Sequence, residues 1–154
     1  MANRCMTFAL GPTILMVVPL TICLAAEKIA AQKAVEEILA AHSEITGLEI
    51  AATRTEQEGC KTIAATEPKE VGEKCDADEL TAIKTNRPLV EQEKDEFDVT
   101  LPMHDSEGKI IATAGMDFRV SGQTRETVSR RAKRIVAEIE KRFTSKEQLF
   151  APAR

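Results

Sequence analysis

The stretch "DVTLPMHDSEGKIIATAGMDF", residues 98–118, decides the fold of this chain because it contains a complete strand–turn–strand unit. Two runs of alternating apolar and polar residues flank the polar segment "DSEG" (105–108). Such alternation is typical of strands with one buried face. If these four residues form the turn, Met103 pairs with Ile110. Apolar side chains then match along one face of the hairpin, which is what fixes a register.

The opposite face of this hairpin carries the candidate site. Its unusual residue is Asp117, an acid near the end of an otherwise apolar strand. In the predicted register Glu96 lies directly opposite Asp117, and such opposed carboxylates repel each other unless a cation lies nearby. That positive charge could come from a ligand amine, a metal ion, or one of the bases Lys94, Arg87 and Arg119. Two interpretations stay open: a solvated face with interleaved charges, or a small pocket. The predicted pairs on this face are Thr100–Thr113, Asp98–Gly115 and Glu96–Asp117.

The segments around the hairpin predict an α+β domain with a five-stranded antiparallel sheet, long N- and C-terminal helices and a short internal helix. Apolar residues at helical spacing predict the helices, and short β-rich runs between turn residues predict the strands. Consecutive strands joined by short turns pair antiparallel. The helices are expected at 26–42, 76–85 and 124–143, and the other strands at 48–55, 60–66 and 88–93. We expect one domain over residues 26–144 and a frayed tail over 145–154.

The first 25 residues have the order of a secretory leader. Arg4 precedes an apolar run that extends to Ala26, and Ala25 offers a small residue for cleavage. An uncleaved anchor is the alternative, because the run is about as long as the ~20 residues of a membrane-spanning helix. Both interpretations predict a periplasmic or secreted domain, in contact with a membrane only through this segment if it is uncleaved.

Composition and cysteine usage narrow the function classes. The chain has a net charge of −4 and contains no Trp and no Tyr, which argues against a nucleic-acid partner. Outside the leader only Cys60 and Cys75 remain. In an oxidising compartment they could form a disulfide that stabilises the fold by ~3 kcal/mol, or they could remain separate thiols.

Two stretches, "AATEPKEVG" and "LPMHDSEGKIIATAGMDF", resemble the core of single PAS-like extracellular sensor modules of the Cache (PDC) type. This resemblance implies a PAS-like sheet with a long N-terminal helix on one face and a small-molecule site on the other. It covers about residues 27–121. The positions that carry it are Glu67 to Gly72, Pro102, Asp105, Gly108, Lys109, Gly115 and Asp117.

The resemblance also implies a ligand class and a binding site. Family members bind organic acids, amines or amino acids, and the acid that matches Asp117 receives the ligand's amino group. This chain departs from the pattern because it lacks the tyrosines and tryptophans that usually line the pocket. The resemblance further implies a homodimer through the terminal helices. Our candidate ligand contacts are Asp117, Asp98, Thr100, Arg87 and Arg119, with no cofactor and no metal.

A binding module has two competing function classes, an enzyme and a structural or partner-binding domain. Catalysis is not expected, because the only histidines, His42 and His104, are distant in sequence and no nucleophile or metal-ligand motif is present. The alternative is a structural domain that binds a partner or an anionic membrane surface. It would use the basic C-terminal helix, in which residues 125–142 carry seven bases and three acids.

Overall fold

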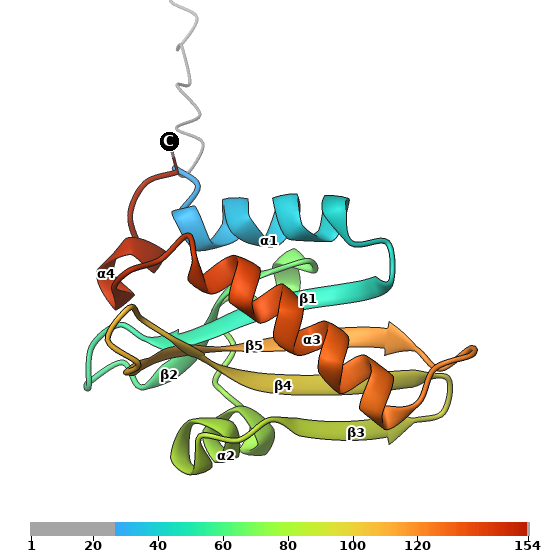
Figure 1. Cartoon of the computed structure of the whole chain (residues 1–154). Coiled ribbons are helices and arrows are strands. Elements are labelled where there is room, and N and C mark those ends of the chain that lie inside the picture. Colours follow the sequence, from blue (N-terminus) through green and yellow to red (C-terminus); the bar gives the residue numbers. More distant parts are fainter. Residues whose placement is uncertain (1–26, 154) are drawn as a thin grey trace, which may run out of the picture.

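The computed structural model describes residues 27–153, which form one five-stranded antiparallel sheet with helices on both faces (Figure 1). The predicted α+β fold is confirmed. The strand order across the sheet is β2–β1–β5–β4–β3. The elements are α1 (Ala30–Ala41), β1 (Ile45–Thr53), β2 (Cys60–Ala65), the 3-10 helix η1 (Pro68–Glu70), α2 (Ala77–Thr85), β3 (Leu89–Glu93), β4 (Glu96–His104), β5 (Ile110–Arg119), α3 (Arg125–Glu140) and α4 (Lys146–Leu149).

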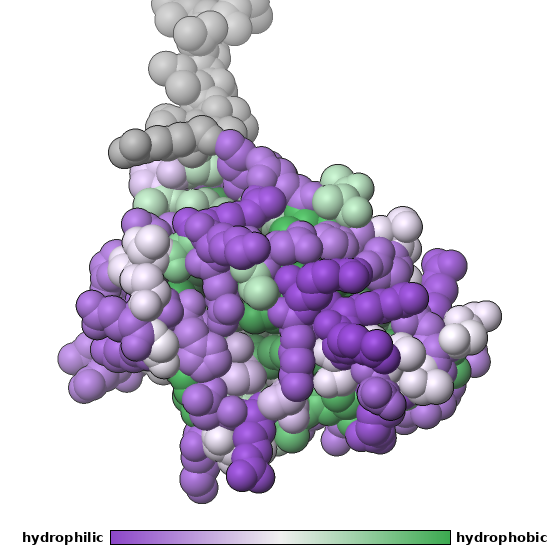
Figure 2. Space-filling model, viewed as in Figure 1, coloured by the Kyte–Doolittle hydropathy of each residue, from purple (hydrophilic) through white to green (hydrophobic). Residues whose placement is uncertain are grey.

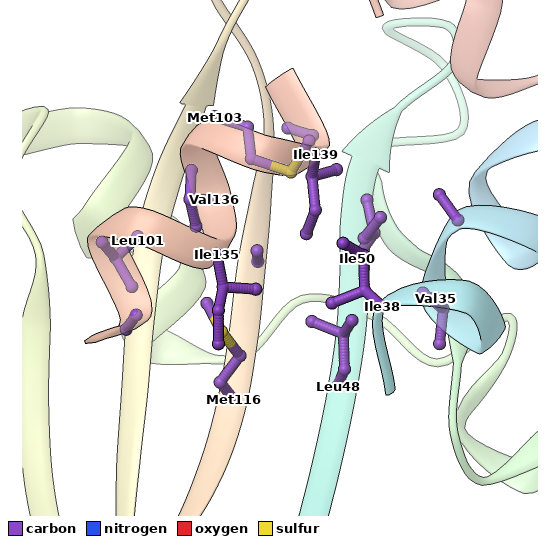
Figure 3. Close-up of a cluster of buried hydrophobic side chains, with 14 of the residues drawn as sticks. Val35, Ile38, Leu48, Ile50, Leu101, Met103, Met116, Ile135, Val136 and Ile139 are labelled. Atoms are coloured by element: carbon purple, nitrogen blue, oxygen red, sulfur yellow. The ribbon is translucent and has the colours of Figure 1, made fainter. Parts of the chain in front are cut away.

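The hydrophobic core lies between the sheet and the two long helices α1 and α3 (Figure 3). Each helix turns one apolar stripe to the sheet, so Val35 and Ile38 of α1 and Ile135 and Ile139 of α3 are almost fully buried. Each such side chain stabilises the fold by about 1.5–3 kcal/mol. From the sheet they meet Leu48, Ile50, Leu101, Met103 and Met116. With this face filled by packing, a binding site has to be sought on the other face.

The register of the central hairpin differs from the predicted one by two residues. Met103 pairs with Ala112 and not with Ile110, which faces His104 across a bulge. The Asp105 carboxylate accepts the backbone N–H groups of Glu107 and Lys109, each at 2.9 Å, so the turn is one residue longer than "DSEG". The bulge adds the second residue. An even shift keeps the apolar faces matched but brings new residues together on the polar face.

Helix α2 begins at a capping box. Asp76 accepts the N–H groups of Asp78 and Glu79 at 2.9 Å, and Glu79 accepts the N–H of Asp76 through Oε2 at 2.9 Å. The N-cap of α2 is therefore Asp76. A cap of this kind stabilises a helix by about 1 kcal/mol. It also fixes the side chain of Glu79 against the polar face of the sheet.

The prediction that residues 145–154 fray is wrong for residues 145–153, the part of this segment that the structure describes. Leu149 of α4 is completely buried in the core. Backbone bonds then join the two ends of the described chain, from Ala30 N–H to Ala151 O and from Ala153 N–H to Lys28 O, both at 2.7 Å. The sequence pattern of four helical residues was too short to reveal this contact.

The leader predicted over residues 1–25 lies outside the described residues. Within residues 27–153, no helix combines the length and apolar character needed to cross a membrane.

Candidate ligand-binding site

A pocket of about 470 Å³ lies on the polar face of the sheet, opposite the core. Its walls are strands β1, β4 and β5, helix α2 and the segment that leads from β2 to α2. The volume falls within the range of small-molecule sites. Its lining is acidic, with Lys74 as the only base among the lining residues. The acids are Glu49, Glu67, Glu70, Glu73, Asp76, Glu79, Glu96, Asp98 and Asp117.

Three of these acids lie in two neighbouring rows of paired residues across the sheet. Asp98 of β4 lies directly opposite Asp117 of β5, which in turn lies opposite Gly47 of β1. Two residues further along, Gly115 lies opposite Glu49. Residues two apart on a strand point to the same face. The carboxylates of Asp98, Asp117 and Glu49 therefore converge over the centre of the sheet.

Two glycines make room for these carboxylates. A Cβ atom at Gly47 would lie 2.2 Å from Oδ2 of Asp117, and one at Gly115 would lie 2.8 Å from Oε1 of Glu49. Each carboxylate thus lies over a glycine of the neighbouring strand, the usual role of glycine where another group approaches a strand closely. β1 begins three residues earlier than the predicted strand at 48, which brings Gly47 inside it.

Glu49 is one of the strand acids whose pKa is strongly raised. Burial raises its pKa to about 7, and the negative charges of Glu79 and Glu70 add to the effect. The hydroxyl of Thr62 donates a hydrogen bond to Oε2 of Glu49 at 3.4 Å. At neutral pH the Glu49 side chain is therefore divided between its protonated and ionised forms.

Asp98 and Asp117 form the opposed pair of acids. Loss of solvent raises the pKa of Asp98 to about 6, helped by the charge of Asp117. Loss of solvent also raises the pKa of Asp117, and here the charge of Glu96 contributes next. Directly opposed like charges disfavour each other in a sheet. A positive charge between the two carboxylates would relieve both effects.

Glu79 supplies an unpaired acceptor to the pocket. The residue is 4% exposed and its Oε2 completes the capping box of α2, but Oε1 is buried and has no hydrogen-bond partner in the described part of the chain. Burial raises the pKa of Glu79. A buried acceptor without a partner costs about 1–3 kcal/mol, so this oxygen is a point at which a donor would bind favourably.

A disulfide holds the outer wall of the pocket. Cys60 and Cys75 are bonded, with their Cα atoms 5.3 Å apart, and they close the segment between β2 and α2. Within it, the backbone N–H of Gly72 donates to Thr62 O at 2.8 Å and that of Thr62 donates to Glu73 O at 3.0 Å. The segment therefore folds back along β2 and carries its acids, Glu67, Glu70 and Glu73, to the pocket.

The structure brings together only some of the residues predicted for the site. Asp117 and Asp98 both line the pocket. Thr100 is buried opposite Gly115 and does not line it. Arg87 is exposed and outside it, and Arg119 pairs across the sheet with Glu96 at a separate hollow. The two predicted basic contacts are therefore absent from the lining, which leaves the pocket more acidic than expected.

Sequence reasoning missed Glu49, Glu79 and the acids between β2 and α2. A signal for Glu49 existed, because it is a lone acid in the apolar run "LEIAA", just as Asp117 is in its own strand. For Glu79 the capping pattern hid its second role. The acids at 67, 70 and 73 could be placed only with the fold of their segment.

The remaining candidate groups serve the domain itself. His42 contacts Glu138 at 2.9 Å and His104 contacts Glu140 at 3.1 Å, so both histidines lie at helix α3, and neither lines the pocket. No group of three or more His, Cys, Asp or Glu among residues 27–153 is arranged to hold a metal ion.

The exposed face of α3 is strongly hydrophilic (Figure 2). Most of its bases already have partners within the domain. Arg134 contacts Glu44, which directly precedes β1. Arg142, just after the end of α3, contacts Glu37 of α1. These contacts hold α3 to neighbouring elements and reduce the positive charge that a membrane would meet. The further contacts are Arg125 to Val90 O, Arg130 to Glu126 and Arg131 to Gln123.

Several solved structures have a similar arrangement at low sequence identity. The GAF domain of nlh2 from A. aeolicus matches with a TM-score of 0.55 and 9% identity, over 73% of this chain and 81% of that one. The inducer-binding domain of PobR from Acinetobacter, in a complex with 3-hydroxybenzoic acid, matches with a TM-score of 0.51 and 10% identity, over 75% and 96%. The fold is GAF/PAS-like.

A third match points to the same fold. The GAF domain of a phosphoenolpyruvate-protein phosphotransferase from Acinetobacter has a TM-score of 0.52 and 9% identity, over 74% of this chain and 82% of that one. No protein-family model and no curated protein matches the sequence. The PAS-like part of the sequence resemblance is confirmed at the level of fold, whereas the Cache type stays a prediction.

Proposed function

We propose that this chain is a small-molecule-binding, sensor-like module without catalytic activity, and that its ligand is a small organic cation. The observation that carries the proposal is the convergence of acids from five parts of the chain on one pocket that also contains the unpaired, buried Oε1 of Glu79. An opposite charge among these carboxylates would restore their ordinary ionisation and satisfy that oxygen.

The sign of the ligand's charge follows from the lining. The similar PobR domain was solved with an organic acid. A carboxylate ligand would need a base in this pocket, yet Lys74 is the only base among its lining residues, and Arg87 and Arg119 lie elsewhere. Of the ligand classes that the resemblance implies, organic acids, amines and amino acids, we therefore favour the amines.

The location is part of the same proposal. We place the domain in the periplasm or outside the cell, free or anchored by its N-terminal segment. The disulfide between Cys60 and Cys75 fits an oxidising compartment, and the leader-like order of residues 1–25 fits export. We also propose that the domain is of the Cache type, and the turn motif from Pro102 to Lys109 together with Asp117 supports this proposal.

Thermal unfolding of the full-length protein against amines, carboxylates, amino acids and divalent metals tests the proposal. A ligand at 100 times its dissociation constant stabilises the folded state by about 2.7 kcal/mol. We expect amines to raise the Tm of the wild type and to lose this effect in Asp117→Asn. The matched control is Glu56→Gln, which removes an exposed acid from the turn between β1 and β2. A response to carboxylates alone would contradict the cationic ligand.

A further inference from the structure

We propose that the pocket binds a linear aliphatic amine with two or more ammonium groups, which lies along the sheet and contacts Asp117 at one end and Glu49 at the other. This inference deepens the proposed function and rests on it. It is carried by the positions of the Asp117 and Glu49 carboxylates over two glycines, by their spacing along the strands, and by the buried oxygen of Glu79.

Two of the strand carboxylates occupy separate positions on the sheet. The carboxylate of Asp117 lies over Gly47, and that of Glu49 lies over Gly115. Asp98 faces Asp117 across the sheet, and its charge also acts on Glu49. Negative charge therefore extends along the strands from Asp117 to Glu49, and a ligand with two ammonium groups can contact both ends.

The strand register sets the distance between these two groups. Asp117 lies opposite Gly47, and Glu49 is two residues further along the same strand. A strand advances about 3.3 Å per residue, so the backbone positions that carry the two carboxylates are about 7 Å apart along the strands. A four-carbon diamine in its extended form has its two nitrogen atoms at a similar separation. A longer polyamine would extend along the strands beyond Asp117, toward Glu96.

The lining selects ammonium groups over other cations. A primary ammonium group has three donors, and the pocket offers mainly acceptors, including the unpaired Oε1 of Glu79, which is in a residue only 4% exposed. No aromatic ring is among the lining residues, so a quaternary ammonium would have no cation–π partner. The described residues also provide no metal-ligand group.

Isothermal titration of the full-length protein at pH 8 and constant ionic strength tests this inference. The probes are butane-1,4-diamine, butylamine, tetramethylammonium and magnesium chloride. The variants are Asp117→Asn and Glu49→Gln, each of which removes one end, with Glu56→Gln as the matched control. Thermal melting of each variant verifies that it is folded before titration.

We expect the diamine to bind the wild type about 10- to 100-fold more tightly than butylamine, because the second ammonium makes its own charge-assisted hydrogen bonds. Each end variant should lose most of this advantage, and Glu56→Gln should keep it. Equal binding of diamine and butylamine would overturn the inference and leave the cationic ligand intact. If only magnesium binds, the amine is wrong. If no cation binds the folded wild type, the proposed function fails as well.

Discussion

Replacement of Glu49 by glutamine should make the free domain more stable at alkaline pH. Burial raises the pKa of this residue from 4.5 to about 7 in the folded state. Below about pH 4.5 the side chain is protonated in both the folded and the unfolded chain and contributes no difference. As the pH rises toward 7, the unfolded chain releases the proton first, so the folded state loses stability.

The size of this loss follows from the shift in the pKa. One pKa unit corresponds to 1.36 kcal/mol, so the shift alone would give about 3 kcal/mol. Because the side chain is only partly buried, solvent screening reduces the expected loss to about 1–2 kcal/mol at pH 8. Glutamine has the same shape and carries no charge. Glu49→Gln should therefore raise the Tm at pH 8 by about 3–8 °C and leave it nearly unchanged at pH 4.

Differential scanning calorimetry of the ligand-free protein at pH 4, 6 and 8 measures this effect. The control, Glu56→Gln, removes the same charge from an exposed turn and should leave the Tm within about 1–2 °C of the wild type, since surface substitutions change stability little. An equal rise at pH 4 and pH 8 would show that ionisation of Glu49 is not the cause. No rise at pH 8 would refute the account of Glu49 as a buried acid whose ionisation opposes folding.

Three further substitutions or treatments test the supports of the pocket. Gly47→Ala should displace Asp117, because the new Cβ would lie 2.2 Å from its Oδ2; amine binding falls, and intact binding would contradict the close contact. Reduction of the disulfide between Cys60 and Cys75 should lower the free energy of unfolding by about 3 kcal/mol, measured by urea denaturation with and without reductant. Leu149→Ala should lower the free energy of unfolding by about 2–5 kcal/mol, since the residue is fully buried. A loss below about 0.5 kcal/mol would support the original prediction that this segment frays.

The sequence was sufficient for the five strands and the three longer helices and for their buried faces, but not for α4. Alternation with a period of two survives any even shift of register, so the apolar face of the central hairpin was predicted correctly even though its pairs were not. The pairing depended on how Asp105 folds the turn and on a bulge beside Met103. Both are local choices among turns of similar energy, and neither leaves a periodic signal.

The same limit explains which part of the site could be predicted. Asp117 and Asp98 were identified because they are acids in strands whose position was clear. The correct register then showed that they face each other, a contact the predicted register did not contain. The acids from 67 to 73 depend on a segment of irregular structure, whose path follows from the disulfide and from bonds to Thr62. Sequence periodicity carries no information about such a segment.

The stability of this domain and its proposed function lie on opposite faces of one sheet. On the core face, packing against α1 and α3 supplies hydrophobic stabilisation. On the pocket face, four acids have raised pKa values, and neutral isosteres would keep the shape while removing the repulsion. These four acids reduce stability, yet glycines, a helix cap and a disulfide hold them in place. Folding alone does not explain such an arrangement. A cationic ligand gives them a role, because it would convert the repulsion into binding energy.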